Sequence, residues 1–158
     1  MCSTSSTQRP RVFLHSSALF SGVFSSSGAA RLVLRLGESG VIELLVSSQV
    51  VAETERALRR KAARVLGHLA ILLDVSGCRV VPNPGLEVVR EWESLIPYLP
   101  DASLLAAAVA AGADYFVTLD RQHFLENTLL MSDPPLRIGT PGDLVEWLRS
   151  RLGAVAKD

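Results

Sequence analysis

The chain has few of the features that mark several large classes of protein. It has only two cysteines in 158 residues, Cys2 and Cys78, and their positions do not suggest a disulfide scaffold. Its 16 basic and 16 acidic residues cancel, so no overall positive charge attracts nucleic acid from a distance. These absences favour a reducing, cytoplasmic setting and restrict any contact with a polyanion to a local basic surface.

The sequence also lacks the short motifs of several enzyme classes. No G-x-G-x-x-G follows an apolar run and no G-x-x-x-x-G-K-[ST] is present, which argues against dinucleotide-dependent redox chemistry and P-loop phosphate binding. Neither G-x-S-x-G nor H-E-x-x-H occurs. A serine hydrolase with a nucleophile elbow and a zinc protease therefore have little support.

Long apolar runs are absent as well. The longest, residues 104–111, is far shorter than the roughly 20 residues that a membrane span needs, and residues 1–9 have no apolar stretch suited to a signal peptide. We therefore expect no membrane association. We further expect a disordered segment over residues 1–9, a single domain over 10–153 and a flexible tail over 154–158.

What the chain does have is ample material for one core, because 48% of its residues are hydrophobic. Short apolar runs predict five strands, and helical patterns lie between them. The strands are expected at residues 11–14, 42–46, 78–81, 115–119 and 136–138, and the helices at 17–23, 29–36, 49–73, 86–95, 101–111 and 143–152. Strands that are apolar throughout and alternate with helices predict an α/β fold, a parallel sheet with helices on both faces.

Polar residues gather at one edge of this predicted sheet. Right-handed connections bring the carboxyl ends of all the strands to one edge, where such sheets bind ligands. His15 follows the first strand, Asp120 follows the fourth, Asp101 opens the helix before the fourth, and Glu53 lies about one turn into the helix after the second. Three carboxylates in one crevice favour a hard divalent cation, Mg²⁺ or Mn²⁺, and hence phosphodiester hydrolysis.

Each of these acids has an ordinary alternative when it is considered alone. Asp101 is suited to cap a helix, Asp120 could cap the helix after it, and Glu53 could be a solvated surface residue. Only their shared position favours a site. His68 and His123 are interpreted as surface or helix residues, with a substrate contact as the weaker alternative for His123.

A basic stretch follows Glu53. In the predicted helix over residues 49–73, Arg56, Arg60 and Arg64 recur every four residues and so share one face. This stripe either holds the phosphates of a substrate strand or is a solvated helix surface, and the sequence favours neither alternative.

Four segments together resemble a known family. VFLHSSALFSG, VSSQVVAETERAL, LPDASLLAAAVAAGADYFVTLDRQHF and IGTPGDLVEWL are similar in order and spacing to the PIN-domain family, across nearly the whole chain after Arg11. The resemblance implies a three-layer α/β/α sandwich with a five-stranded parallel sheet of order 3-2-1-4-5, and metal-dependent cleavage of RNA. Many relatives are VapC-like toxins that a small antitoxin inhibits, so the resemblance also implies an RNA substrate, an antitoxin partner and a homodimer.

The resemblance assigns roles residue by residue. Glu53, Asp101 and Asp120 match three of the family's four acids and are expected to bind the metal, while Ser17 and Thr118 complete the pocket. The remaining position of the four is the first in chain order. There, after VFL, the family pattern has an aspartate and this chain has His15.

Three consequences of His15 stay open at the level of the sequence. In the first, a protonated imidazole takes the place of the cation. In the second, a neutral imidazole binds a softer ion such as Mn²⁺ or Zn²⁺. In the third, the site has lost its metal-binding function. We therefore expect a PIN-like, divalent-metal-dependent ribonuclease with a site altered by His15. The alternative is a catalytically impaired PIN-like module that binds RNA or a protein partner.

Overall fold

The computed structural model describes residues 8–156 of the chain. Cys2 and residues 1–7 of the expected disordered segment lie outside the described residues, as do residues 157–158 of the expected tail. The last helix continues to Ala156, so the expected tail begins inside a helix.

The centre of the structure is a five-stranded sheet of order β3-β2-β1-β4-β5. All four neighbouring pairs are parallel, which confirms the predicted α/β fold and strand order. The strands are β1 (Arg11–Leu14), β2 (Glu43–Ser47), β3 (Arg79–Val81), β4 (Tyr115–Val117) and β5 (Arg137–Gly139).

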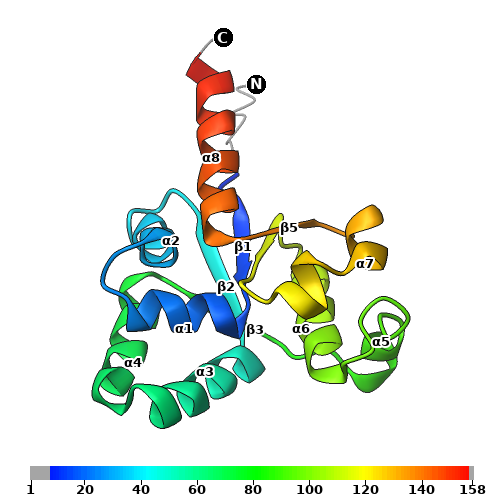
Figure 1. The fold of residues 1–158 in the computed structure, drawn as a ribbon. Helices are drawn as coiled ribbons and strands as arrows, with labels where there is room; N and C mark the ends of the chain where they lie inside the picture. Colours follow the sequence, from blue (N-terminus) through cyan, green and yellow to red (C-terminus); the bar gives the residue numbers. More distant parts are fainter. Residues whose placement is uncertain (1–7, 157–158) are drawn as a thin grey trace, which may run out of the picture.

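Helices cover both faces of this sheet. Figure 1 shows α1 and α2 on one side of the strands and α6 on the other, while α8 extends to the top of the view, away from α3 at the bottom. The helices are α1 (Ser16–Phe24), α2 (Ala29–Glu38), α3 (Ser48–Lys61), α4 (Leu66–Val75), α5 (Leu86–Arg90), α6 (Leu99–Ala110), α7 (Thr128–Ser132) and α8 (Pro141–Ala156), with a 3₁₀ turn η1 (Ala63–Val65) and a π-helical turn η2 (Arg121–Leu125).

The prediction of one helix over residues 49–73 is wrong. The helix is interrupted at Ala62, which is buried and has φ −154° and ψ 54°, and the chain then turns through η1 into α4. A straight helix of that length would extend about 37 Å and carry its second half beyond the core. Because α3 ends at Lys61, Arg64 lies in η1, and only Arg56 and Arg60 of the expected stripe share a helix.

Three smaller differences concern short elements. The helix predicted over residues 86–95 ends at Arg90 and continues as turns. The apolar pattern predicts neither η2 nor α7, although Asp120 as the cap of a following helix was one alternative. Each begins at a side-chain cap: Asp120 accepts a hydrogen bond from the peptide N–H of His123, and Asn127 accepts one from that of Leu130. Elements of five residues carry too few apolar positions to show a helical period.

The core lies between the central strands and the helices on each face. Phe13 of β1 and Phe116 of β4 are fully buried and stack with their ring centroids 5.5 Å apart, and Phe124 of η2 stacks on Phe116 at 4.8 Å. The last contact ties the loop after β4 to the sheet. Within residues 8–156, no helix has the length and apolar character that crossing a membrane requires.

Gly37 offers a test of this packing. A Cβ at position 37 would lie 2.5 Å from Leu44 Cδ1 and 2.9 Å from the backbone oxygen of Ser76, whereas a Cβ at Gly67 in α4 would meet nothing. We predict that Gly37→Ala lowers the free energy of unfolding by about 1–3 kcal/mol, and that the control Gly67→Ala leaves it unchanged or raises it by up to about 1 kcal/mol. Urea unfolding measures both, and equal losses for the two variants would contradict the packing described.

Candidate active site

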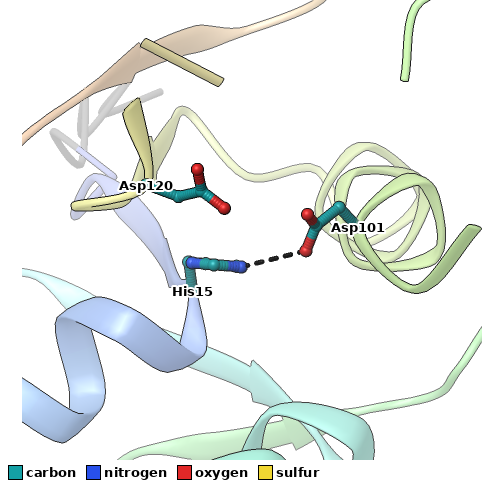
Figure 2. Close-up of side chains that lie close together, drawn as sticks. All are labelled: His15, Asp101 and Asp120. Carbon is teal, nitrogen blue, oxygen red and sulfur yellow. Dashed lines mark hydrogen bonds and ion pairs between the residues drawn. The ribbon is translucent and has the colours of Figure 1, made fainter. Parts of the chain in front are cut away.

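Three of the predicted site residues meet at the carboxyl edge of the sheet. His15 directly follows β1, Asp120 lies three residues after β4, and Asp101 is in the first turn of α6. Figure 2 shows their side chains pointing toward one another from these three elements. One potential ligand atom from each residue lies within 4.8 Å of the others, a distance that a single metal ion can bridge.

His15 is held in place by the sheet and by aromatic rings. Its peptide N–H donates to the carbonyl of Val117 at 2.9 Å, which extends the pairing of β1 with β4. The imidazole is almost fully buried and packs against Phe116 and Phe124, with ring centroids 5.9 and 5.1 Å away. Its Nε2 lies 3.2 Å from Oδ1 of Asp101. Since an ionised carboxylate only accepts, Nε2 carries the proton in this contact.

Two hydroxyl groups contact the other ring nitrogen of His15. Nδ1 lies 2.8 Å from Ser17 Oγ and 3.1 Å from Thr118 Oγ1. Each hydroxyl oxygen also accepts a peptide N–H, from Leu119 at 2.9 Å for Ser17 and from Asp120 at 3.0 Å for Thr118. A hydroxyl that has accepted one hydrogen bond retains a proton to donate and a second lone pair. Ser17 and Thr118 therefore suit either neutral tautomer of His15, including the one whose Nε2 is free to bind a metal.

His123 lies in the helical turn η2, which agrees with its interpretation as a surface or helix residue, but its side chain is also a member of this site. Its Nδ1 lies 2.5 Å from Oδ2 of Asp101 and 3.3 Å from Oδ2 of Asp120. Its peptide N–H donates to Oδ1 of Asp120 at 3.1 Å. The sequence holds only a partial signal for this, because a capping aspartate accepts the peptide N–H of the residue three positions later but does not fix where its side chain lies.

The two aspartates differ in how they serve their helices. Asp101 is the third residue of α6, and Tyr98 holds the cap position, so the alternative of Asp101 as a helix cap is wrong. The expectation that Asp120 could cap the helix after it is confirmed, because its side chain caps η2. Asp101 is buried and both of its oxygens contact an imidazole, Oδ1 that of His15 and Oδ2 that of His123. Its negative charge also lies near the positive end of the α6 dipole.

Glu53 lies beside this cluster and is joined to it indirectly. The amide of Gln49 donates to Glu53 Oε1 at 2.9 Å and to the backbone oxygen of Pro100 at 2.8 Å. Gln49 thus links the half-buried Glu53 of α3 to the residue before Asp101. Glu53 is not one of the three residues whose ligand atoms converge within 4.8 Å.

The converging donors suit a particular class of metal ion. They are one imidazole nitrogen and two carboxylates, and a mixed nitrogen and oxygen set matches Mn²⁺, Zn²⁺ and similar transition metals better than Mg²⁺, which favours oxygen ligands. The three side chains come from separate elements around a common centre, so they fit a bound divalent ion. A site of four carboxylates would instead favour Mg²⁺, because all of its ligand atoms would be oxygens.

The predicted basic stripe lies away from this centre. Arg56 and Arg60 are exposed on α3, with Arg60 about 10 Å farther along the helix than Glu53. The guanidinium of Arg64 lies over the ring of Phe24 at 6.0 Å from its centroid. Arg56 and Arg60 therefore remain available to a ligand that extends along α3 from the acid cluster.

The fold and the acidic edge of the sheet agree with a comparison of the sequence with protein families. A family model described as PIN domain matches residues 11–122, which is more than half of the chain. The chain belongs to the PIN-domain family. No curated protein matches it.

Several solved structures share its fold. PAE2754 from Pyrobaculum aerophilum is 21% identical with a TM-score of 0.61, and the match covers 90% of this chain and 98% of that one. VapBC2 from Rickettsia felis, bound to a DNA fragment from its promoter, is 19% identical with a TM-score of 0.59, covering 81% and 96%. VapC20 from Mycobacterium tuberculosis, a toxin that cleaves the sarcin-ricin loop, is 21% identical with a TM-score of 0.53, covering 73% and 94%.

Thr118 provides a test of the network around His15. Its side chain is fully buried, and Thr118→Val would remove the hydroxyl that contacts His15 Nδ1 and accepts the N–H of Asp120. We predict a loss of about 1–3 kcal/mol in the free energy of unfolding, because a polar group loses its partner. Thr128→Val, at an exposed position in α7, is the control and should change stability by less than about 0.5 kcal/mol. Equal stability of the two variants in urea unfolding would show that the hydroxyl of Thr118 is not part of a tight network.

Proposed function

We propose that the chain is a divalent-metal-dependent endoribonuclease with an altered metal site. The observation that carries the proposal is the convergence of His15, Asp101 and Asp120 within 4.8 Å at the carboxyl edge of a PIN-domain sheet. His15, Asp101 and Asp120 are the proposed metal ligands. Glu53 assists, by binding the metal or by orienting water, through its link to the start of α6.

The proposed cofactor is Mn²⁺ in preference to Mg²⁺, with Zn²⁺ as a further candidate. An imidazole in place of a carboxylate removes one negative charge and introduces a softer donor, and both changes disfavour Mg²⁺. When bound, the ion would supply activation of water and compensation of the charge that develops on the phosphate.

The chain's own residues have separate tasks in this proposal. The hydroxyls of Ser17 and Thr118 hold the imidazole of His15 in the orientation that turns Nε2 toward Asp101. Arg56 and Arg60 bind phosphates of the RNA strand outside the cluster, where contacts fix the position of the strand without reading its sequence.

We further propose that the chain is the toxin of a toxin–antitoxin pair. Its fold is shared with VapC20, which cleaves the sarcin-ricin loop, and with the VapBC2 complex. A small antitoxin protein is the proposed partner, RNA the proposed substrate and a homodimer the proposed assembly.

A second candidate function has its own supporting observation. Both oxygens of Asp101 already contact imidazoles, and every buried polar side-chain atom of the described chain has a partner. A network satisfied in this way suits a catalytically impaired module that binds RNA or a protein. It predicts that RNA binds but is not cleaved with Mg²⁺, Mn²⁺ or Zn²⁺.

The replacement His15→Asp separates the two candidates. It restores the fourth acid, so we predict that ribonuclease activity with Mg²⁺ rises at least about tenfold and that the ratio of Mn²⁺ to Mg²⁺ activity falls. The measurement is the initial rate of cleavage of a labelled RNA with each metal in turn. His68→Asp is the matched control, since it makes the same chemical change at an exposed position of α4 and should leave both rates unchanged.

The same assay defines the outcomes that count against the proposal. If His15→Asp is no more active than the parent with Mg²⁺, the account of an altered site is wrong. The nuclease proposal requires cleavage with at least one metal and its loss in Asp101→Asn. If such cleavage is not found with any metal, the impaired module is the better description.

The arginines of α3 generate a separate prediction. If Arg56 and Arg60 each bind a phosphate, replacing both with glutamine should weaken RNA binding and reduce the slope of log K against log salt concentration by about 1.4 for a single strand. Arg149→Gln, on α8 and paired with Glu146, is the control. A slope that stays the same in the double variant would exclude the phosphate contacts.

A further inference from the structure

We propose that Tyr98 and His123 form a stacking platform for an unpaired nucleobase beside the acid cluster. The inference deepens the proposed function, because it names the form of RNA that the site accepts. The two rings lie parallel within 24° with their centroids 5.0 Å apart. Tyr98 is nevertheless 53% exposed. His123 covers one face of the Tyr98 ring, and more than half of the residue is still open to solvent.

The platform is fixed relative to the metal-binding residues. The carbonyl oxygen of Tyr98 accepts the peptide N–H groups of Asp101 and Ala102, both at 3.1 Å, at the start of α6. His123 is held by its contacts with Asp101 and Asp120. A base stacked on Tyr98 would therefore lie two aromatic rings away from these carboxylates, in a position that needs no reordering of the backbone.

The chemistry of the surroundings selects a base as the ligand group. Asp101 and Asp120 are the acids that His123 contacts, and their negative charge disfavours a phosphate at this point. The exposed ring of Tyr98 offers aromatic, uncharged surface at this point. A flat, uncharged and partly apolar group suits such a surface, and nucleobases stack on tyrosine and histidine rings in this way.

A stacking platform makes a demand on the substrate. A base in a duplex has both faces covered by its neighbours, whereas a base in a single strand or a loop can leave the stack and lie on a protein ring. The platform therefore selects single-stranded or looped RNA over duplex RNA. Because every base has an aromatic face, it sets little preference for sequence.

The test measures RNA binding apart from cleavage. Fluorescence anisotropy follows a labelled single strand of about 12 nucleotides, and the same strand annealed into a duplex, with EDTA present to prevent metal-dependent cleavage. Tyr98→Ala and Tyr98→Leu should weaken single-strand binding by about 5- to 150-fold, while Tyr98→Phe should leave it unchanged. Tyr98→Leu keeps an apolar side chain without a ring, and Leu129→Ala changes an exposed apolar residue of α7 as the matched control.

Steady-state kinetics with metal give a second readout. Loss of a base contact made equally in the ground and transition states raises KM and leaves kcat unchanged, whereas a displaced His123 would lower kcat. The proposal requires a rise in KM for Tyr98→Ala. A fall in kcat alone would overturn it and assign Tyr98 the role of positioning His123.

The remaining outcomes separate this inference from the proposed function. Cleavage of RNA by the wild type, together with unchanged binding in Tyr98→Ala, would overturn the platform and leave the nuclease proposal in place. Binding that depends on the Tyr98 ring, without cleavage by any metal, would support the platform and overturn the nuclease. If the single strand does not bind, or if Tyr98→Leu binds it as well as the wild type, the exposed ring serves a partner other than a base.

Discussion

The contact of one buried carboxylate with two imidazoles determines how the rest of the site is arranged. Asp101 is oriented by His15 on one side and by His123 on the other. A buried ionised carboxylate costs several kcal/mol unless partners compensate it, and here both oxygens have a nitrogen partner. Every other feature of the site supports this contact: the hydroxyls hold His15, the cap of η2 holds His123, and Phe124 packs η2 against the sheet.

The sheet topology explains how these residues come together. In the order β3-β2-β1-β4-β5, β1 and β4 are neighbours, so His15 and Asp120 follow adjacent strands although 105 positions separate them in the sequence. Asp101 reaches the same edge because α6 starts there and runs back before β4. The hydrogen bond from the amide of Gln49 to Pro100 adds α3, and with it Glu53, to the border of the site. The parallel sheet thus supplies the proximity, and His15 brings an imidazole nitrogen to the two carboxylates.

The sequence was sufficient for much of the fold and for part of the site. The strands were predictable because buried parallel strands are short apolar runs, and the positions of His15, Asp101 and Asp120 relative to them are local. The order of the strands followed only from the resemblance to the PIN-domain family. The end of α3 at Ala62 was not predictable, because no residue next to Ala62 interrupts the helical pattern. The turn there depends on the packing of Ala62 in the core. The role of His123 was missed for a similar reason. Its contact with Asp101 is tertiary and depends on a turn of five residues whose capping signal is weak by itself.

The central claim is that the imidazole of His15 and the carboxylates of Asp101 and Asp120 together form one site for a divalent ion. The most direct measurement is anomalous X-ray diffraction from crystals soaked in Mn²⁺, recorded near the manganese absorption edge. We expect one anomalous peak within bonding distance of His15 Nε2, Asp101 and Asp120, with the direct contact between His15 and Asp101 replaced by the ion. A peak bound only by carboxylates, or an intact contact between His15 and Asp101 with no ion at the carboxyl edge, would contradict it.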